Sequence, residues 1–423
     1  SPRPRRVPSI VDVHQPPEED RAPFEATGNG IRLACVLIGS SLIYGLGLGL
    51  TDLWAQDEPR YAAIAEQLRD GRHGLRGVFL LHLNDQVYSQ KPPLYFWLAA
   101  LLGTPGGRVT EVAARLPSAL AGLASVALTA KIGRQLRLPR GLALLGAAML
   151  ATSFRFAHTA RRAQLDGLLV AFELVAIALY LSLEARGGAE RARERTMAVA
   201  GLHAALGAAA LTKGPVGWLP LLVIAVHLLA ERRGAALRAI VPAWALGLSL
   251  GPLLLWAATS IALAPPGYVD VAIGENLFGR FLSGTSHARP LYYYAYQVPL
   301  DFLPWSLLLP LGVAALAQSA RRETTDEAGH EALSDRRAAR FLIAWVVVPL
   351  VFFTLSAGKR GVYLLPMFPA LARVTGRAGG GAGGARGGGR GGGGGARGWG
   401  GRGGGGGAGC EALGVGVAGR GSV

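Results

Sequence analysis

Charged residues are scarce in this chain of 423 residues. They make up 17% of it, and hydrophobic residues make up 51%, whereas soluble domains carry charge at about a quarter of their positions. The apolar residues form long blocks, of which the clearest are 31–50, 167–183, 239–262 and 341–355. Each block approaches the ~20 apolar residues that one bilayer crossing needs. The composition therefore excludes a soluble globular protein and predicts a membrane protein with several spans.

Cysteine is equally scarce, and its two positions exclude two classes of protein. Cys35 lies inside the first apolar block and Cys410 lies near the C-terminus, so neither a disulfide framework nor a cysteine metal cluster is expected. The formal charge of +16 is concentrated in short loops between apolar blocks and in a C-terminal tail. Basic loops beside spans set membrane orientation, so this charge does not predict nucleic-acid binding. The first block is too long and too far along the chain for a cleaved signal peptide.

The composition divides the chain into three parts. Residues 1–30 are rich in proline and charge and are predicted to form a disordered cytoplasmic arm. Residues 31–375 form the expected membrane domain, in which a polar first loop, 51–91, carries a surface helix at 59–68. Residues 376–423 are a Gly/Ala/Arg repeat that cannot bury a core. We expect this tail to come from a frameshift or a truncated gene rather than to be an RNA-binding segment.

The loop charges predict an all-α bundle of about ten spans. Four Arg-rich segments, 133–140, 187–196, 231–238 and 319–340, are placed in the cytoplasm. The expected spans are then 31–50, 111–132, 141–157, 167–186, 197–212, 215–230, 239–262, 301–318, 341–356 and 362–374.

Two segments do not fit a simple succession of spans. Residues 92–103 are too short to cross and are predicted to form an interfacial half-helix. The short blocks 197–212 and 215–230 are joined only by Lys213–Gly214, so they are either two spans or one long bent element.

Most polar residues at span ends fall on one membrane face, the outer one. An ionisable residue close to a bilayer is costly, so its default interpretation is functional. A lone Lys or Arg more often snorkels to the interface, but Asp and Glu are too short to do so. The outer-face set is Asp57, Glu58, Arg60, Lys91, Asp166, Lys213, Glu275, Asn276, Arg280, His287, Lys359 and Tyr363.

The acidic residues of this set carry the first chemical hypothesis. Asp57 and Glu58 follow the first span and precede Arg60; such carboxylates can bind a metal or act as a general base held by a cation. They suit the first turn of a helix with Pro59 at its start equally well. Asp166 opens a span, so it is either a helix cap or a second acidic group of the site.

The basic residues carry the second hypothesis. Lys91 begins an apolar helix with Pro92 and Pro93 in its first turn, and a cation beside exposed helix N–H groups suits a phosphate at the membrane surface. Lys213, in LTKGPVG, and Lys359, in SAGKRGVYLLP, each lie at a break between apolar segments. Either is a loop anchor or a second phosphate contact.

Taken in order, these segments resemble one family. The pieces DEPRYA, QKPPLYFWL, ARRAQLDGLL, LTKGPVG, ENLFGRF…HARPLYYY…PLDFLPW and GKRGVYLLPMFP are similar to membrane glycosyltransferases related to protein O-mannosyltransferases and the lipid A aminoarabinose transferase, of the GT-C fold. No single piece is specific, but their order and common face are. The resemblance covers about residues 31–372.

The resemblance implies a function and assigns roles to residues. It implies inverting, single-displacement transfer of a sugar from a polyprenyl-phosphate donor, on the outer face of the bacterial inner membrane, to lipid A, another envelope glycan or a protein. Asp57, with Glu58, would be the general base or a metal-associated carboxylate, and Asp166 the second acidic group. The implied donor-phosphate contacts are Lys91, Arg60, Arg280, Lys359 and Tyr363. The implied acceptor or metal-associated residues are Glu275, Asn276 and His287.

Two departures from the family pattern limit these expectations. Gln90 stands where some members have a metal-linked acidic residue, and Asn276 stands where some have His, so a divalent ion stays an open cofactor. The family also continues past the last spans, where this chain has its Gly/Arg tail. The alternatives are a truncated inactive relative, or a lipid or solute transporter. A transporter predicts internal repeats and charges near the midplane, whereas the sequence has charges at span ends and no evident repeat.

Overall fold

The computed structural model describes residues 18–54, 57–186, 192–275, 288–321 and 334–377, which all belong to one structural unit, residues 1–383. Within these ranges the regular elements are helices, apart from a two-stranded antiparallel hairpin, β1 (His82–Leu83) and β2 (Gln86–Val87), and an isolated bridge between Ala288 and Gly358. The predicted all-α architecture is confirmed. The Gly-rich tail beyond residue 377 and the expected site residues Asn276, Arg280 and His287 lie outside the described residues.

The N-terminal helix, α1 (Glu18–Gly45), is longer at its start and shorter at its end than the predicted span at 31–50. Its first residues were expected to belong to a disordered arm, yet residues 18–30 are helical. Residues 46–50 form turns instead of extending the helix.

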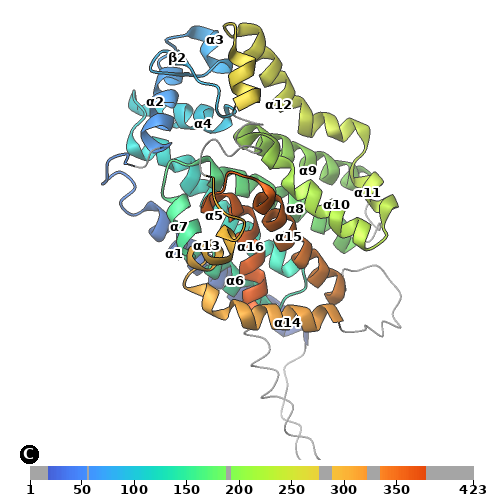
Figure 1. Ribbon diagram of the computed structural model, residues 1–423. Helices are drawn as coiled ribbons and strands as arrows, with labels where there is room; N and C mark the ends of the chain where they lie inside the picture. The colour runs from blue at the N-terminus through green and yellow to red at the C-terminus, as the bar shows by residue number, and fades with distance from the viewer. Residues whose placement is uncertain (1–17, 55–56, 187–191, 276–287, 322–333, 378–423) are drawn as a thin grey trace, which may run out of the picture. The chain divides into compact units, whose positions relative to one another are not determined.

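The first loop folds into short elements that pack on one end of the bundle (Figure 1). These are α2 (Asp57–Arg69), α3 (Gly74–Phe79), the hairpin and α4 (Leu94–Gly103), which is followed by η1 (Thr104–Gly106). α2 matches the predicted surface helix, and α4 is a ten-residue helix, as short as expected for residues 92–103. α2 packs against α4 through Tyr61. Its ring meets that of Phe96 edge to face, with 5.3 Å between the ring centroids.

The core of the bundle is built on α8 (Leu165–Arg186). It packs against α5 (Glu111–Gln135) on one side and α9 (Ala192–Lys213) on the other. α12 (Ala243–Leu263) covers α9, and its far end meets α3 (Figure 1), where Trp256 and Ser260 donate hydrogen bonds to the Phe79 carbonyl. α12 therefore connects the bundle to the first loop.

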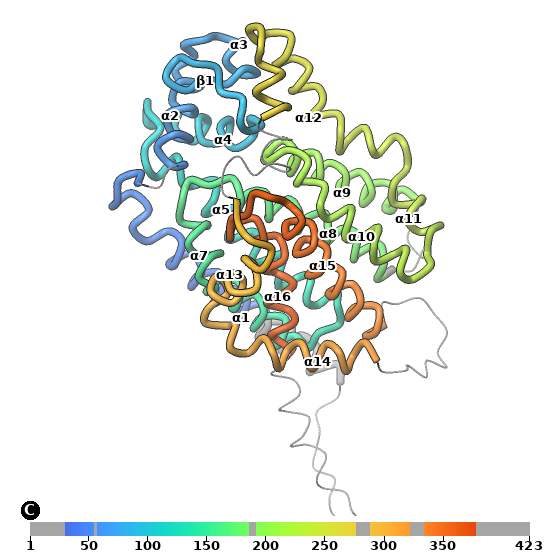
Figure 2. Tube along the Cα trace, in the orientation of Figure 1, coloured from blue at the N-terminus to red at the C-terminus, as the bar shows by residue number. Residues whose placement is uncertain are grey.

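The remaining helices surround this core. α6 (Arg140–Thr152) packs on α5, and α7 (Phe154–Ala160) follows it after a sharp bend. α10 (Leu219–Ala230) packs against α15 (Asp335–Leu355). The other elements are η2 (Gly214–Trp218), α11 (Gly234–Ile240), α13 (Tyr293–Asp301), η4 (Trp305–Leu308), α14 (Leu309–Arg321), η5 (Gly361–Met367) and α16 (Phe368–Gly376). Figure 2 traces their order along the chain.

The helices long enough to cross a membrane can be compared with the ten spans expected. Among the described residues, five helical segments are long and apolar enough to cross a membrane, and the count is seven if two bent helix pairs each form one span. α6 and α7 are bent by 66°, and α13 and the η4–α14 segment by 110°. One of the five segments, Ala192–Ala230, covers the two expected spans 197–212 and 215–230, and the two bent pairs cover the expected spans 141–157 and 301–318. The five segments are Glu111–Gln135, Leu165–Ala185, Ala192–Ala230, Ala243–Leu263 and Asp335–Leu355.

The chain reverses direction at η2, between the two short blocks whose connection the sequence left open. Lys213, at the end of α9, meets Asp166 at the start of α8. Arg233, just after α10, meets Glu184 at the opposite end of α8. α9 and α10 therefore run in opposite directions, so residues 192–230 do not form one straight span. The reversal requires glycine at position 217, because a Cβ there would overlap the backbone of α9.

The exterior of the bundle is apolar. Exposed large hydrophobic side chains lie along α12, including Leu254 and Leu255, which are 59% and 70% exposed. Soluble monomeric proteins rarely expose many large apolar side chains side by side, whereas the lipid of a membrane accommodates them. The chain is accordingly a multi-pass membrane protein.

Candidate active site

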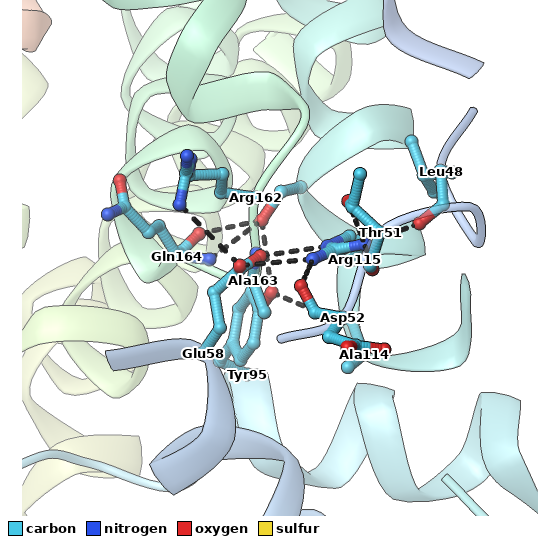
Figure 3. Close-up of polar contacts among 11 residues, drawn as sticks. Leu48, Thr51, Asp52, Glu58, Tyr95, Ala114, Arg115, Arg162, Ala163 and Gln164 are labelled. Atoms are coloured by element: carbon cyan, nitrogen blue, oxygen red, sulfur yellow. Dashed lines mark hydrogen bonds and ion pairs between the residues drawn. The ribbon is translucent and has the colours of Figure 1, made fainter. Parts of the chain in front are cut away.

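The centre of the candidate site is a buried ion pair that joins four segments of the chain (Figure 3). Glu58, in the first turn of α2, is fully buried and accepts two hydrogen bonds from Arg115 of α5, at 2.9 and 3.1 Å. The Ala163 N–H also donates to Glu58 Oε1 at 2.8 Å, and Arg162 Nη1 lies 3.7 Å from Oε2. Both oxygens of this carboxylate are therefore occupied by protein groups.

Arg115 uses its other donors on the end of α1 and the start of the first loop. Its guanidinium donates to the carbonyl oxygens of Leu48, Thr51 and Asp52 at 2.6, 2.8 and 2.9 Å (Figure 3). The planar fork of an arginine suits such a set of acceptors. The pair thus holds α2 and α5 against the turn after α1 and against the segment that leads into α8.

The electrostatics of Glu58 agree with an anchoring role. Burial alone raises the pKa of this carboxyl, but the hydrogen bonds from Arg115 and the Ala163 N–H outweigh it, so the pKa lies below its usual value. Glu58 is thereby held as a carboxylate with no free oxygen. The sequence placed Glu58 beside Asp57 as a catalytic candidate; in the structure, protein groups contact both oxygens of Glu58.

Asp57 faces away from this anchor toward two cations. Its carboxylate lies 3.6 Å from Arg60 Nη1 and 3.4 Å from Arg360 Nη2. The Asp57 side chain is 17% exposed, so it is accessible in a way that Glu58 is not. Arg60 also reaches Gln90 Oε1 at 3.4 Å, next to Lys91. These contacts link the start of α2 with the segment that carries the predicted phosphate-binding lysine.

Arg360 is the cation that the sequence analysis missed. The motif GKRGVYLLP drew attention to Lys359, but Lys359 is 3% exposed, and its Nζ donates to the carbonyl oxygens of Ser356 and Arg289 at 2.6 and 3.2 Å. Lys359 therefore joins its own turn to the segment that precedes α13, and its neighbour Arg360 faces Asp57. Burial lowers the pKa of Arg360, but the carboxylates of Asp57 and Asp166 outweigh that effect and raise it.

A further ion pair, between Asp166 and Lys213, lies close enough to Arg360 to interact with it electrostatically. Asp166, at the start of α8, forms an ion pair with Lys213, at the end of α9, and both side chains are about one-tenth exposed. Lys213 Nζ also lies over the ring of Tyr363, 4.8 Å from its centroid, in cation–π geometry. Asp166 is thus more than a helix cap, and three of the sequence candidates, Asp166, Lys213 and Tyr363, are brought together.

Two further candidates, Lys91 and Glu275, are among the described residues. Lys91 lies partly buried at the bend before α4, and Glu275 is exposed. Within the described ranges, no group of three or more His, Cys, Asp or Glu side chains is placed to hold a metal ion. The carboxylates of the cluster are instead paired with Arg and Lys, which is a donor set for anions rather than for metals.

The first loop carries a pair of stacked histidines that predicts a pH effect. His73 and His82 stack at 3.7 Å between ring centroids, and His82 is 9% exposed. Burial and the neighbouring His73 lower the pKa of His82. A histidine with a lowered folded-state pKa contributes stability above the unfolded pKa of about 6.5, and this stability is lost as pH falls through the folded value.

We therefore expect the unfolding temperature of the purified protein to fall between about pH 7 and pH 5, and His82→Phe to flatten this slope. Leu83→Phe, on the same strand, is the control and should keep the wild-type slope whatever its stability at pH 7. The measurement is thermal unfolding in detergent at a series of pH values. An equal slope in His82→Phe and wild type would remove His82 as the cause.

The geometry defines a class of protein: a multi-pass membrane protein with a carboxylate flanked by cations at one end of its helical bundle. The model of the dolichyl-phosphate-mannose-protein mannosyltransferase family matches residues 31–262. The chain belongs to this family, which confirms the resemblance found in the sequence.

Individual relatives and solved structures agree with this assignment. The undecaprenyl phosphate-α-4-amino-4-deoxy-L-arabinose arabinosyl transferase of Pseudomonas aeruginosa (strain LESB58) is 32% identical over 360 residues, which cover 81% of this chain and 58% of that protein. The crystal structure of ArnT from Cupriavidus metallidurans bound to undecaprenyl phosphate has a TM-score of 0.67 at 24% identity, covering 84% of this chain and 60% of that one.

A more distant structure shares the fold. The archaeal oligosaccharyltransferase AglB from Archaeoglobus fulgidus, in complex with an inhibitory peptide and a dolichol-phosphate, has a TM-score of 0.55 at 13% identity over 84% of this chain and 50% of that one. These likenesses show the GT-C fold. The chain spans about three-fifths of the length of the curated relatives that it matches.

Proposed function

We propose that this protein transfers a sugar from a polyprenyl-phosphate donor to an acceptor on the outer face of the bacterial inner membrane. The observation that carries the proposal is the Asp57 carboxylate, held between Arg60 and Arg360 beside the Asp166–Lys213 pair. Family membership supports the same reaction class. The donor named for the Pseudomonas aeruginosa relative, 4-amino-4-deoxy-L-arabinose on undecaprenyl phosphate, is the one we propose.

The proposed reaction is a single displacement. The acceptor hydroxyl oxygen attacks the anomeric carbon, and the bond from that carbon to the phosphate oxygen breaks. The leaving phosphate keeps the electron pair, while the hydroxyl proton passes to Asp57. Lys91, Arg60 and Lys213 are the cations proposed to stabilise the charge that develops on the phosphate. Attack on the face opposite the leaving group inverts the anomeric configuration.

Some of the proposed residues position other groups, and one takes part in proton transfer. Glu58 has no free oxygen, so we assign it to positioning and Asp57 to proton transfer. Asp166 is paired with Lys213 and is proposed to orient that lysine. Tyr363 supports the same lysine through its ring. For the acceptor, lipid A is the first candidate to test, ahead of another envelope glycan or a protein.

The test is transfer of labelled aminoarabinose from undecaprenyl phosphate to lipid A, in membranes that contain the expressed protein. Labelled lipid A that depends on the protein and on the donor is the expected result. A full-length relative in parallel membranes shows that donor and acceptor are competent. Transfer by the relative without transfer by this chain would contradict the proposal.

Lys91→Ala is expected to raise the apparent KM for the lipid donor by about 10- to 100-fold. The reason is that a hydrogen bond to a charged group contributes roughly 1.5–3 kcal/mol, and each 1.4 kcal/mol is about tenfold in affinity. Lys131→Ala, an exposed lysine of α5, is the matched control. Initial rates at varied donor concentration give the answer. An unchanged donor KM in Lys91→Ala would remove Lys91 from the phosphate site.

A further inference from the structure

A buried ion pair outside the candidate site, between Arg155 and Asp301, lies next to Gly361, the residue after Arg360. Asp301, at the end of α13, is 2% exposed, and its Oδ1 accepts hydrogen bonds from Arg155 of α7 at 2.9 and 2.7 Å. Gln297, one turn earlier on α13, donates to the same oxygen at 2.8 Å. The Phe154 N–H also donates to the Leu303 carbonyl at 2.9 Å. The end of α13 is therefore locked onto α7.

The same face of α13 contacts the backbone that carries Arg360. Tyr294, Gln297 and Asp301 are spaced i, i+3 and i+7, so they share one face of the helix. Tyr294 donates its hydroxyl proton to the Arg360 carbonyl at 3.2 Å. A Cβ at Gly361 would overlap Asp301 Oδ2 and lie 3.1 Å from Gln297 Nε2. The face thus fits closely against the 360–361 peptide and needs glycine at position 361.

We propose that the Arg155–Asp301 pair is a positioning device that holds the 360–361 peptide so that the Arg360 guanidinium faces Asp57. The backbone of Arg360 is extended, with φ −137° and ψ 145°. Its guanidinium Nη2 lies 3.4 Å from Asp57 Oδ2. The Tyr363 N–H donates to the Arg360 carbonyl at 3.1 Å and fixes the start of η5, and the face of α13 adds contacts from a distant part of the chain. The pair acts through Arg360 and rests on the proposed function of Asp57 as the proton acceptor.

Kinetics of a double-mutant cycle separate this role from general stability. Asp301→Asn and Gly361→Ala should each lower kcat about tenfold while the donor KM changes by less than about twofold. In an Arg360→Gln background neither change should lower kcat further, because Arg360 is no longer there to be positioned. Gly251→Ala, where a Cβ meets no atom within 4 Å, is the control. Additive losses in kcat would overturn the proposal.

A spectroscopic measurement tests the positioning without any activity. A spin label at Arg360→Cys, with Cys35 and Cys410 replaced by serine, should be immobile when Asp301 is present and mobile in Asp301→Asn or Gly361→Ala. Because Gly361→Ala keeps both charged partners, it reports on the 361 contact even if Asp301→Asn folds poorly. A label at Lys131→Cys should not change. Equal line shapes at position 360 would overturn the positioning role, whether or not the protein transfers sugar.

Discussion

Asp57→Asn is expected to lower kcat for sugar transfer by about 10²- to 10⁴-fold, the usual contribution of a general base. Asparagine keeps the size and the hydrogen-bonding reach of the side chain but cannot accept the proton of the acceptor hydroxyl. The fold should survive, because Asp57 is a partly exposed group whose two cationic partners lie at 3.4 and 3.6 Å. Thermal unfolding and initial rates on the same purified sample measure both properties.

The matched control for this change is Asp52→Asn. Asp52 lies in the same loop, and its backbone carbonyl, rather than its carboxylate, accepts from Arg115. Asp52→Asn should therefore leave kcat and the unfolding temperature near the wild-type values. Turnover of Asp57→Asn at the wild-type rate would take Asp57 out of the mechanism and leave Asp166 as the carboxylate to test.

The adjacent pairs Asp57–Glu58 and Lys359–Arg360 show where prediction from sequence stops. Motif and composition singled out Asp57, Glu58 and Lys359, because ionisable residues close to a bilayer are costly, but they missed Arg360. They did not decide which member faces inward. Neighbouring residues on a helix or an extended strand point in different directions, and the partner that selects one of them is distant in sequence. Arg115 selects Glu58, and the carbonyls of Arg289 and Ser356 select Lys359.

The helices themselves were largely predictable, because periodicity and apolar runs act locally. Helix breaks were less so: the bend between α6 and α7 was not predicted, whereas the break at Lys213–Gly214 was, with one long bent element as the alternative. The Asp166–Lys213 pair joins residues 47 positions apart, so no local sequence pattern could predict it. The order of motifs along the chain nevertheless identified the family, since order reflects the whole fold rather than one contact.

Glu58→Gln is expected to destabilise the protein by about 3–5 kcal/mol, the usual cost of removing one partner of a buried ion pair. The loss arises because Arg115, 4% exposed, would keep its charge without the compensating carboxylate. Glu111→Gln, in the first turn of α5, is the matched control and should cost less than about 1 kcal/mol. The measurement is equilibrium unfolding of both variants in detergent with a chemical denaturant.

The pH dependence of the same variant gives an independent check. Because the folded-state pKa of Glu58 is lowered, its contribution is present above the unfolded pKa of about 4.3 and is lost as pH falls through the folded value. Wild type should therefore lose stability below about pH 4, and Glu58→Gln should lose less. Replacing both partners, as Glu58→Met with Arg115→Met, should recover part of the loss, because no unpaired charge is then buried. A double variant as unstable as Glu58→Gln would show that the carbonyl contacts of Arg115, rather than the ion pair, hold α5 to the first loop.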